Sequence, residues 1–200
     1  MTGPDTMPQP ERDEKKRIQI LDSAADLFSR RGFDKTSIRG LASEARVSTS
    51  TIYAHFADKD DLLLQSIDRR LSVVEQKVTR IAEHDPDPLQ QLKTILSVIH
   101  NSLKDDPFLR KILIFDSQVV DHRLHQRADL ARNRIKALAL QGLRNAVTSG
   151  VLDCDDVDAL ETVLRVSFQG WVLSVENGTD EISEERLTKM LIHLVEGRRK

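Results

Sequence analysis

The stretch that decides the fold is T-S-I-R-G-L-A-S-E-A-R-V-S-T-S-T-I-Y-A-H-F-A-D-K-D-D-L, residues 36–62. It predicts two short helices, one from Thr36 or Ser37 to about Glu44 and one capped by Ser48 that ends near His55. Serine and threonine favour these starts because their hydroxyls accept the free N–H groups of a first helical turn. The apolar residues spaced to lock the pair together are Ile38, Leu41, Ala42, Val47 and Ile52.

Two short helices joined by a tight turn indicate a helix-turn-helix, whose second helix fits the major groove of DNA. The exposed start of that helix must then be polar, and residues 48–51 are Ser-Thr-Ser-Thr. Hydroxyls donate to phosphate oxygens, and the free N–H groups of a helix N-terminus also bind phosphate. The sequence therefore predicts a DNA-reading segment here.

Outward from this segment, periodicity predicts an all-α chain. A bracing helix is expected over about 12–31, stopped by Gly32, so residues 11–58 form a three-helix DNA-binding domain. Residues 1–10 contain three prolines among polar residues and are expected to be a disordered tail. The domain over 59–200 is expected to hold six helices, which cover about 59–84, 89–103, 107–115, 120–148, 155–176 and 183–198.

Residues 36–62, with the preceding A-A-D-L-F-S-R-R-G-F of residues 24–33, resemble the signature of the tetracycline-repressor (TetR, AcrR-like) family. The resemblance covers about a fifth of the chain. It implies a bacterial, sequence-specific transcriptional regulator that binds a palindromic double-stranded operator as a homodimer and is released by a small-molecule ligand. Repression is the default that it implies, with activation as an alternative. It also implies that the domain over 59–200 binds the ligand and dimerises.

The resemblance implies roles for particular residues of the first domain. The expected DNA contacts are Arg39, Arg46, Ser48, Thr49, Ser50, Thr51, Tyr53, His55 and Lys59. Tyr53 has the alternative of a packing aromatic, and His55 that of a solvated histidine at a helix end. Arg46 departs from the family, where glycine or asparagine is usual in the turn, so it is either strained in a left-handed conformation or an added phosphate contact. Ser50 stands where glycine or proline is common, so base preference does not carry over.

The second domain gives weaker signals. The candidate pocket residues are His100, Phe108, Ile112, Phe115, Gln118, Val119, His122, Arg134, Phe168 and Trp171. The helix over 155–176 is apolar on more than one face, which predicts burial against a second copy. The candidate dimer residues are Val163, Val166, Gly170, Leu187, Met190, Leu191 and Leu194. Plain core or surface positions, and a deep monomer core, are the alternatives.

Composition limits the location of the protein and the kinds of partner expected for it. The lone Cys154 excludes an intrachain disulfide, and no apolar run reaches the ~20 residues of a membrane span, so a cytoplasmic protein is expected. Residues 11–59 hold ten basic and eight acidic side chains, and residues 60–200 hold twenty and twenty-three. This small asymmetry has the sign expected of a DNA-binding N-terminus.

Metal and catalytic sites are not expected, and neither is a cofactor. His122 and His125 are two ligands where zinc needs three or four. The acidic run 153–158 lacks the glycine and glutamate of a calcium loop. There is no nucleophile–base arrangement and no glycine-rich phosphate loop, which argues against an enzyme. A helical interaction module that has lost DNA binding remains the other alternative.

Overall fold

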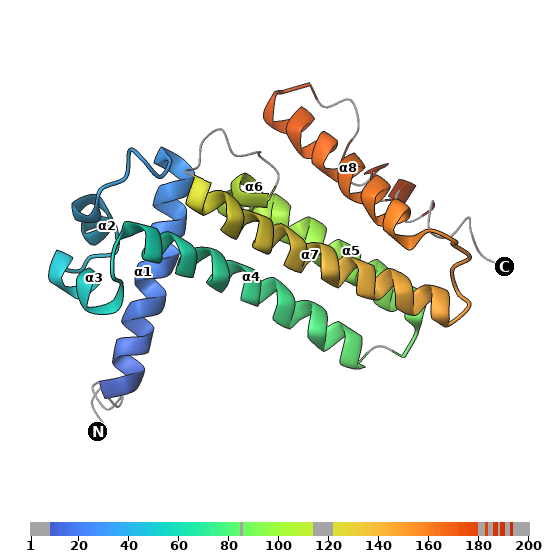
Figure 1. The fold of residues 1–200 in the computed structure, drawn as a ribbon, viewed down its shortest axis with the longest axis horizontal. Helices are drawn as coiled ribbons and strands as arrows, with labels where there is room; N and C mark the ends of the chain where they lie inside the picture. The colour runs from blue at the N-terminus through green and yellow to red at the C-terminus, as the bar shows by residue number, and fades with distance from the viewer. Residues whose placement is uncertain are drawn as a thin grey trace. The chain divides into compact units, whose positions relative to one another are not determined.

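The computed structural model describes residues 9–84, 86–113 and 122–179, with isolated residues at 183, 186–187, 189–190 and 193. Its regular elements in that part of the chain are all α-helices (Figure 1). The chain divides into two compact units. One is Met1–Arg70 with Asp116–Arg127, and the other is Leu71–Phe115 with Ala128–Lys200. The all-α fold expected from periodicity is confirmed.

The first unit contains α1 (Gln9–Arg31), α2 (Ile38–Glu44), α3 (Thr49–His55) and the start of α4 (Lys59–His84). Because α1 begins at Gln9, the expected disordered tail over 1–10 is wrong at residues 9 and 10. Proline is tolerated at position 10 because the N–H groups of a first helical turn have no partner within the helix. Residues 1–8 lie outside the described part of the chain.

The core of the first unit is built on one face of α1. That face buries Ile20, Leu21, Ala24, Ala25, Leu27 and Phe28. Leu41 of α2, Ile52 of α3 and Leu62 of α4 are also almost fully buried, with 0–1% of each residue exposed. Each fully buried leucine or isoleucine contributes roughly 1.5–3 kcal/mol relative to an exposed one. The short helices α2 and α3 could not persist alone, so their stability comes from this packing.

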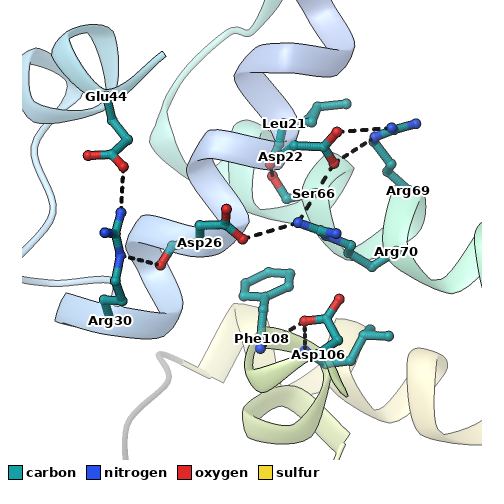
Figure 2. Close-up of polar contacts among 11 residues, drawn as sticks. Leu21, Asp22, Asp26, Arg30, Glu44, Ser66, Arg69, Arg70, Asp106 and Phe108 are labelled. Atoms are coloured by element: carbon teal, nitrogen blue, oxygen red, sulfur yellow. Dashed lines mark hydrogen bonds and ion pairs between the residues drawn. The ribbon is translucent and has the colours of Figure 1, made fainter. Parts of the chain in front are cut away.

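Polar contacts hold the start of α4 against α1 (Figure 2). Arg69 donates from Nε and Nη2 to the two carboxylate oxygens of Asp22, each at 3.0 Å. Arg70 Nη2 lies 3.2 Å from Asp26 Oδ1, and the buried Ser66 hydroxyl is 3.3 Å from the carbonyl oxygen of Leu21. The compact unit therefore extends to Arg70, beyond the boundary that we expected after residue 58.

The second unit contains the rest of α4 with α5 (Pro88–Asp105), α6 (Pro107–Leu113), α7 (His122–Thr148) and α8 (Val157–Glu176). Asp87 caps α5 by accepting the N–H group of Leu89 at 2.9 Å. The core cluster joins side chains of α5, α7, α8 and the α7–α8 connection. Its buried members are Leu89, Leu92, Leu143, Ala146, Leu152, Cys154, Leu160 and Leu164.

The ninth helix expected over 183–198 lies mainly outside the described residues. Within that segment, the described residues 186–187, 189–190 and 193 are helical. The helix expected over 120–148 corresponds to α7. Its expected start at residue 120 also falls outside the described residues, and α7 is described from His122. In the described part of the chain, no helix combines the length and the apolar character that a membrane span requires.

Candidate nucleic-acid interface and ligand cavity

The turn between α2 and α3 is closed by a Schellman motif. Arg46 has a φ of 55°, in the left-handed region. Its N–H donates to the carbonyl of Ser43 at 3.2 Å, and the N–H of Val47 donates to that of Ala42 at 2.9 Å. These two bonds satisfy carbonyls that the end of α2 leaves free. The left-handed conformation, one of two alternatives expected for Arg46, is therefore present.

A contact from α1 secures the same turn. The side-chain amide of Gln19 donates to the carbonyl of Ala45 at 2.9 Å. Ala45 is the C-cap of α2 and is 1% exposed. At the last residue of α2, the guanidinium of Arg30 donates to the carboxylate of Glu44 at 2.5 Å (Figure 2). The two backbone hydrogen bonds of the turn and the two side-chain bonds from α1 thus hold the chain in the direction in which it enters α3.

Serine hydroxyls cap both short helices as expected. Ser37 Oγ accepts the N–H of Gly40 at 3.1 Å, and Ser48 Oγ accepts the N–H of Thr51 at 3.0 Å. Ser48 Oγ also lies 2.7 Å from Ser50 Oγ and 2.8 Å from Thr51 Oγ1. The start of α3 is therefore a connected group of three hydroxyls beside free backbone N–H groups, a combination that suits an anionic oxygen.

The structure gathers the expected DNA-contact residues on α2, α3 and the start of α4 in the first unit. Arg39, Arg46, Ser48, Thr49 and Ser50 are exposed, whereas Thr51, His55 and Lys59 are half-buried. Tyr53 is 58% exposed. That exposure argues against the alternative in which Tyr53 only packs in the core, because more than half of the residue is open to solvent.

Lys59 is partly engaged inside the protein. Its Nζ donates to the carbonyl oxygens of Phe33 at 3.0 Å and Thr36 at 3.2 Å. It also lies 4.0 Å from the centroid of the Phe33 ring. An ammonium group has three donors, so these bonds leave one for a phosphate. These bonds could not be predicted from the sequence, because they depend on where the loop after α1 lies.

The second unit contains a cavity of about 350 Å³ among α5, α7 and α8. Its apolar wall comes chiefly from Leu96, Ile99, Leu103, Ile135, Leu164 and Phe168. Its charged lining comes from Asp129, Arg132, Lys136, Glu161 and Arg165. A mostly apolar concave site with a few grouped polar side chains is typical of small-molecule binding.

Only some expected pocket residues meet at this cavity. His100 and Phe168 line it, with ring centroids 4.2 Å apart, and the Trp171 ring lies 5.5 Å from that of His100. Phe108 and Ile112 are buried but do not line it. Arg134 instead forms a two-bond ion pair with Glu75, both at 2.6 Å. Phe115, Gln118 and Val119 lie outside the described residues, as does the side chain of His122.

The charged residues of the cavity lining were not among those predicted from the sequence. Glu161, Arg165 and Gln169 recur every four residues on α8, and Arg132 and Lys136 are four apart on α7. The four-residue spacing indicates that these side chains share one side of each helix, but it does not show that this side faces a cavity. In the part of the chain that the structure describes, no three metal-ligating side chains come together.

The helix α8 presents apolar residues on two faces. One face buries Leu160, Leu164, Phe168 and Val172. On the other, Val163 and Val166 are 52% and 53% exposed and Leu173 is 36% exposed. Gly170 is exposed there too, with open space where a Cβ atom would stand. Beyond α8, Met190 is 58% exposed and Leu187 half-buried, while Leu191 and Leu194 lie outside the described residues.

The DNA-binding unit is similar to known proteins. Residues 20–65 match the model of the bacterial regulatory proteins of the tetR family. The chain carries a tetR-family regulatory domain. The expected resemblance is thereby confirmed, and the matched residues run from α1 through α2 and α3 into α4.

Relatives extend the likeness along the chain. The transcriptional regulator HbdR of Aromatoleum sp. (strain CIB) is 40% identical over 79 residues, 40% of this chain and 34% of that protein. The repressor AcnR of Corynebacterium diphtheriae is 25% identical over 184 residues, 88% of this chain and 89% of that protein. The chain spans between 34% and 61% of the length of the first four curated relatives it matches.

A solved structure shares the fold of both units. The transcriptional regulator from Saccharomonospora viridis, solved in complex with choline, has a TM-score of 0.76 and 21% identity. The match covers 92% of this chain and 96% of that one. The likeness shows that the fold, an N-terminal helix-turn-helix followed by a helical second domain, also occurs in that protein.

Arg46 generates the first prediction. Replacing it with glycine removes the cost of a left-handed conformation, so Arg46→Gly should raise the free energy of unfolding by about 1 kcal/mol. Arg46→Ala is the matched control, because it removes the same side chain but keeps the strain, and it should give no such gain. Urea denaturation followed by circular dichroism measures both. Equal stabilities for the two variants would contradict a strained turn.

Proposed function

We propose that this protein is a sequence-specific DNA-binding transcriptional regulator, acting as a repressor, that binds a palindromic operator as a homodimer and is released by a small-molecule effector. The observation that carries the proposal is the start of α3, where exposed hydroxyls and free N–H groups are held by a closed turn. The tetR-family match over 20–65 supports it. Because its partner is the bacterial chromosome, we assign the protein to the cytoplasm.

In this proposal α3 enters the major groove with its N-terminus foremost. Thr49 and Ser50 reach base edges or phosphates, and Arg39 of α2 binds a phosphate or a guanine edge. Arg46 and the one remaining donor of Lys59 bind phosphates at the two ends of α3. Tyr53 and His55 add donors to the DNA backbone, which position the helix without reading sequence.

The proposed dimer forms through the exposed apolar face of α8. Val163, Val166, Gly170 and Leu173 are spaced by three, four and three residues, so they form one stripe on the helix. Glycine in the middle of the stripe lets a second helix approach closely. A twofold pairing of such stripes would cover side chains that are half exposed in one protomer, and would give two DNA-reading helices for the two halves of a palindrome.

The cavity among α5, α7 and α8 is the proposed effector site. A related fold was solved with choline, and one relative is named as a repressor, which supports both halves of the proposal. An effector can release DNA only if it binds the two states of the dimer with different affinities. Repression and release therefore require two conformations of the dimer, one that binds the operator and one that the effector favours.

Selection from a random duplex library tests DNA binding. We expect the recovered sequences to share a palindrome, and affinity for it to fall steeply with salt because Lys and Arg contacts release counterions. Arg39→Ala should weaken binding to that palindrome by about 1–3 kcal/mol if Arg39 reads a base. Lys77→Ala, an exposed position of α4 in the second unit, removes the same charge and should have little effect. Recovery of no shared motif by the folded protein would favour the interaction-module alternative.

The α8 stripe generates a separate prediction. Light scattering with size exclusion should show a particle of twice the 22.7 kDa chain mass, and Val163→Glu with Val166→Glu should reduce it to 22.7 kDa. Both side chains are half exposed in the protomer, so the double variant should fold normally by circular dichroism. Gln141→Glu, an exposed position of α7, is the control and should remain dimeric. A wild-type particle of 22.7 kDa at micromolar concentration would exclude the dimer.

A further inference from the structure

The charged lining of the cavity points to the chemistry of its occupant. We propose that the cavity among α5, α7 and α8 takes an uncharged, largely apolar molecule through a hydroxyl group that donates to Glu161 and accepts from Lys136. This inference rests on the effector-binding half of the proposed function and names the class of the effector.

Glu161 is a buried carboxylate with one oxygen in use. The residue is 3% exposed and lines the cavity. Its Oε1 accepts a bond from Arg165 Nε at 3.1 Å. Within the part of the chain that the structure describes, its Oε2 is buried and has no hydrogen-bond partner. A buried charged oxygen without a hydrogen bond is costly, so this atom favours an occupant that brings a donor.

Lys136 is the complementary group on α7. Its Nζ lies 4.0 Å from Glu161 Oε2, which is close enough for charge attraction but too far for a hydrogen bond. The side chain is 37% exposed and also lines the cavity. An acceptor placed beside Oε2 would therefore find an ammonium donor within reach.

The 4.0 Å separation fits one bridging oxygen atom. Two hydrogen bonds of about 2.8 Å span that distance when they meet at roughly a right angle. A hydroxyl carries a donor and two acceptor lone pairs on one atom, so it can bond both partners at once. A carboxylate brings no proton for Glu161, and an ammonium group brings no lone pair for Lys136.

Charge supports the choice of a neutral head group. Asp129 pairs with Arg132, Glu161 pairs with Arg165, and Lys136 brings a third positive charge. A cation would therefore enter a lining with one surplus positive charge. An anion bonded to Lys136 in this gap would lie next to the Glu161 carboxylate, which repels it.

The remaining wall sets the body of the ligand. Leu96, Ile99 and Leu103 of α5 face the cavity with Leu164 and Phe168 of α8. Phe168 lies within a group of three rings, with its centroid 4.2 Å from that of His100 and 6.0 Å from that of Trp171. An alkyl chain or ring system fits these surfaces, and about 350 Å³ is at the small end for ligand pockets.

Three probes with the same ten-carbon chain test the head group: 1-decanol, decanoate and decylamine. The chain has a single tryptophan, Trp171, whose ring lies beside two rings of the cavity wall, so its fluorescence reports binding to the full-length protein. We expect 1-decanol to bind at least tenfold more tightly than either charged probe. Glu161→Gln and Lys136→Met should each weaken 1-decanol binding by about tenfold, the effect of losing one hydrogen bond to a charged group.

The unmutated protein separates the ligand classes by its preference among the three probes. If it binds decanoate more tightly than 1-decanol, the site is for anions, and if it binds decylamine more tightly than 1-decanol, the site is for cations. Unchanged affinity for 1-decanol in both variants would show that water, and no ligand hydroxyl, fills the gap. Each of these results overturns the proposal. Should Glu161→Gln fail to fold, the half-exposed Lys136→Met alone carries the test.

The DNA selection and the 1-decanol binding assay test separate hypotheses, so either can be rejected without the other. A protein that selects a palindrome but does not prefer 1-decanol keeps the proposed function and loses the inference about its effector. A protein that prefers 1-decanol but selects no palindrome keeps the hydroxyl site and loses the role in DNA binding. The two proposals are thus tested by separate readouts on the same purified chain.

Discussion

The left-handed turn at Arg46 is the constraint on which the DNA-reading end depends. Its two hydrogen bonds end α2 and allow the chain to reverse direction within three residues before Ser48 caps α3. Arginine in this conformation costs about 1–2 kcal/mol relative to a right-handed residue. The bond from Gln19 to Ala45 and the buried Ile52 offset that cost, so α3 keeps a fixed direction. A helix held this way can present its first turn to a groove without first being ordered.

In each of the two units, a packed core supports helices that carry polar residues. In the first, the α1 core and the Asp22–Arg69 pair hold the start of α4 (Figure 2). In the second, the cluster around Leu92 and Leu143 supports α7 and α8, whose charged residues line the cavity. The helix α4 belongs to both units, its residues to Arg70 in the first and the rest in the second. In the proposed mechanism, it is the covalent route by which a ligand in one unit affects DNA binding in the other.

Local chemistry explains how much could be predicted from sequence. The caps at Ser37 and Ser48 follow from side chains that bond the backbone a few residues away, and the structure has both. The Lys59 bonds to the Phe33 and Thr36 carbonyls could not be predicted, because they join segments more than twenty residues apart. The charged lining was missed for the same reason: periodicity shows that Glu161 and Arg165 share a side of α8, but only packing shows that a cavity lies there. The start of α1 at Gln9 was missed because residues 1–10 are polar and have nothing to bury, although a proline fits a first helical turn.

The account depends most on α3 lying in the major groove, and methylation protection of guanine N7 tests that most directly. This atom is exposed only in the major groove, so a helix seated there shields it from dimethyl sulfate. On the palindrome recovered by selection, the account predicts two protected groups of guanines, separated by one helical turn of about 10 base pairs or a multiple of it. Protection confined to adenine N3 in the minor groove, with guanine N7 left reactive, would contradict it.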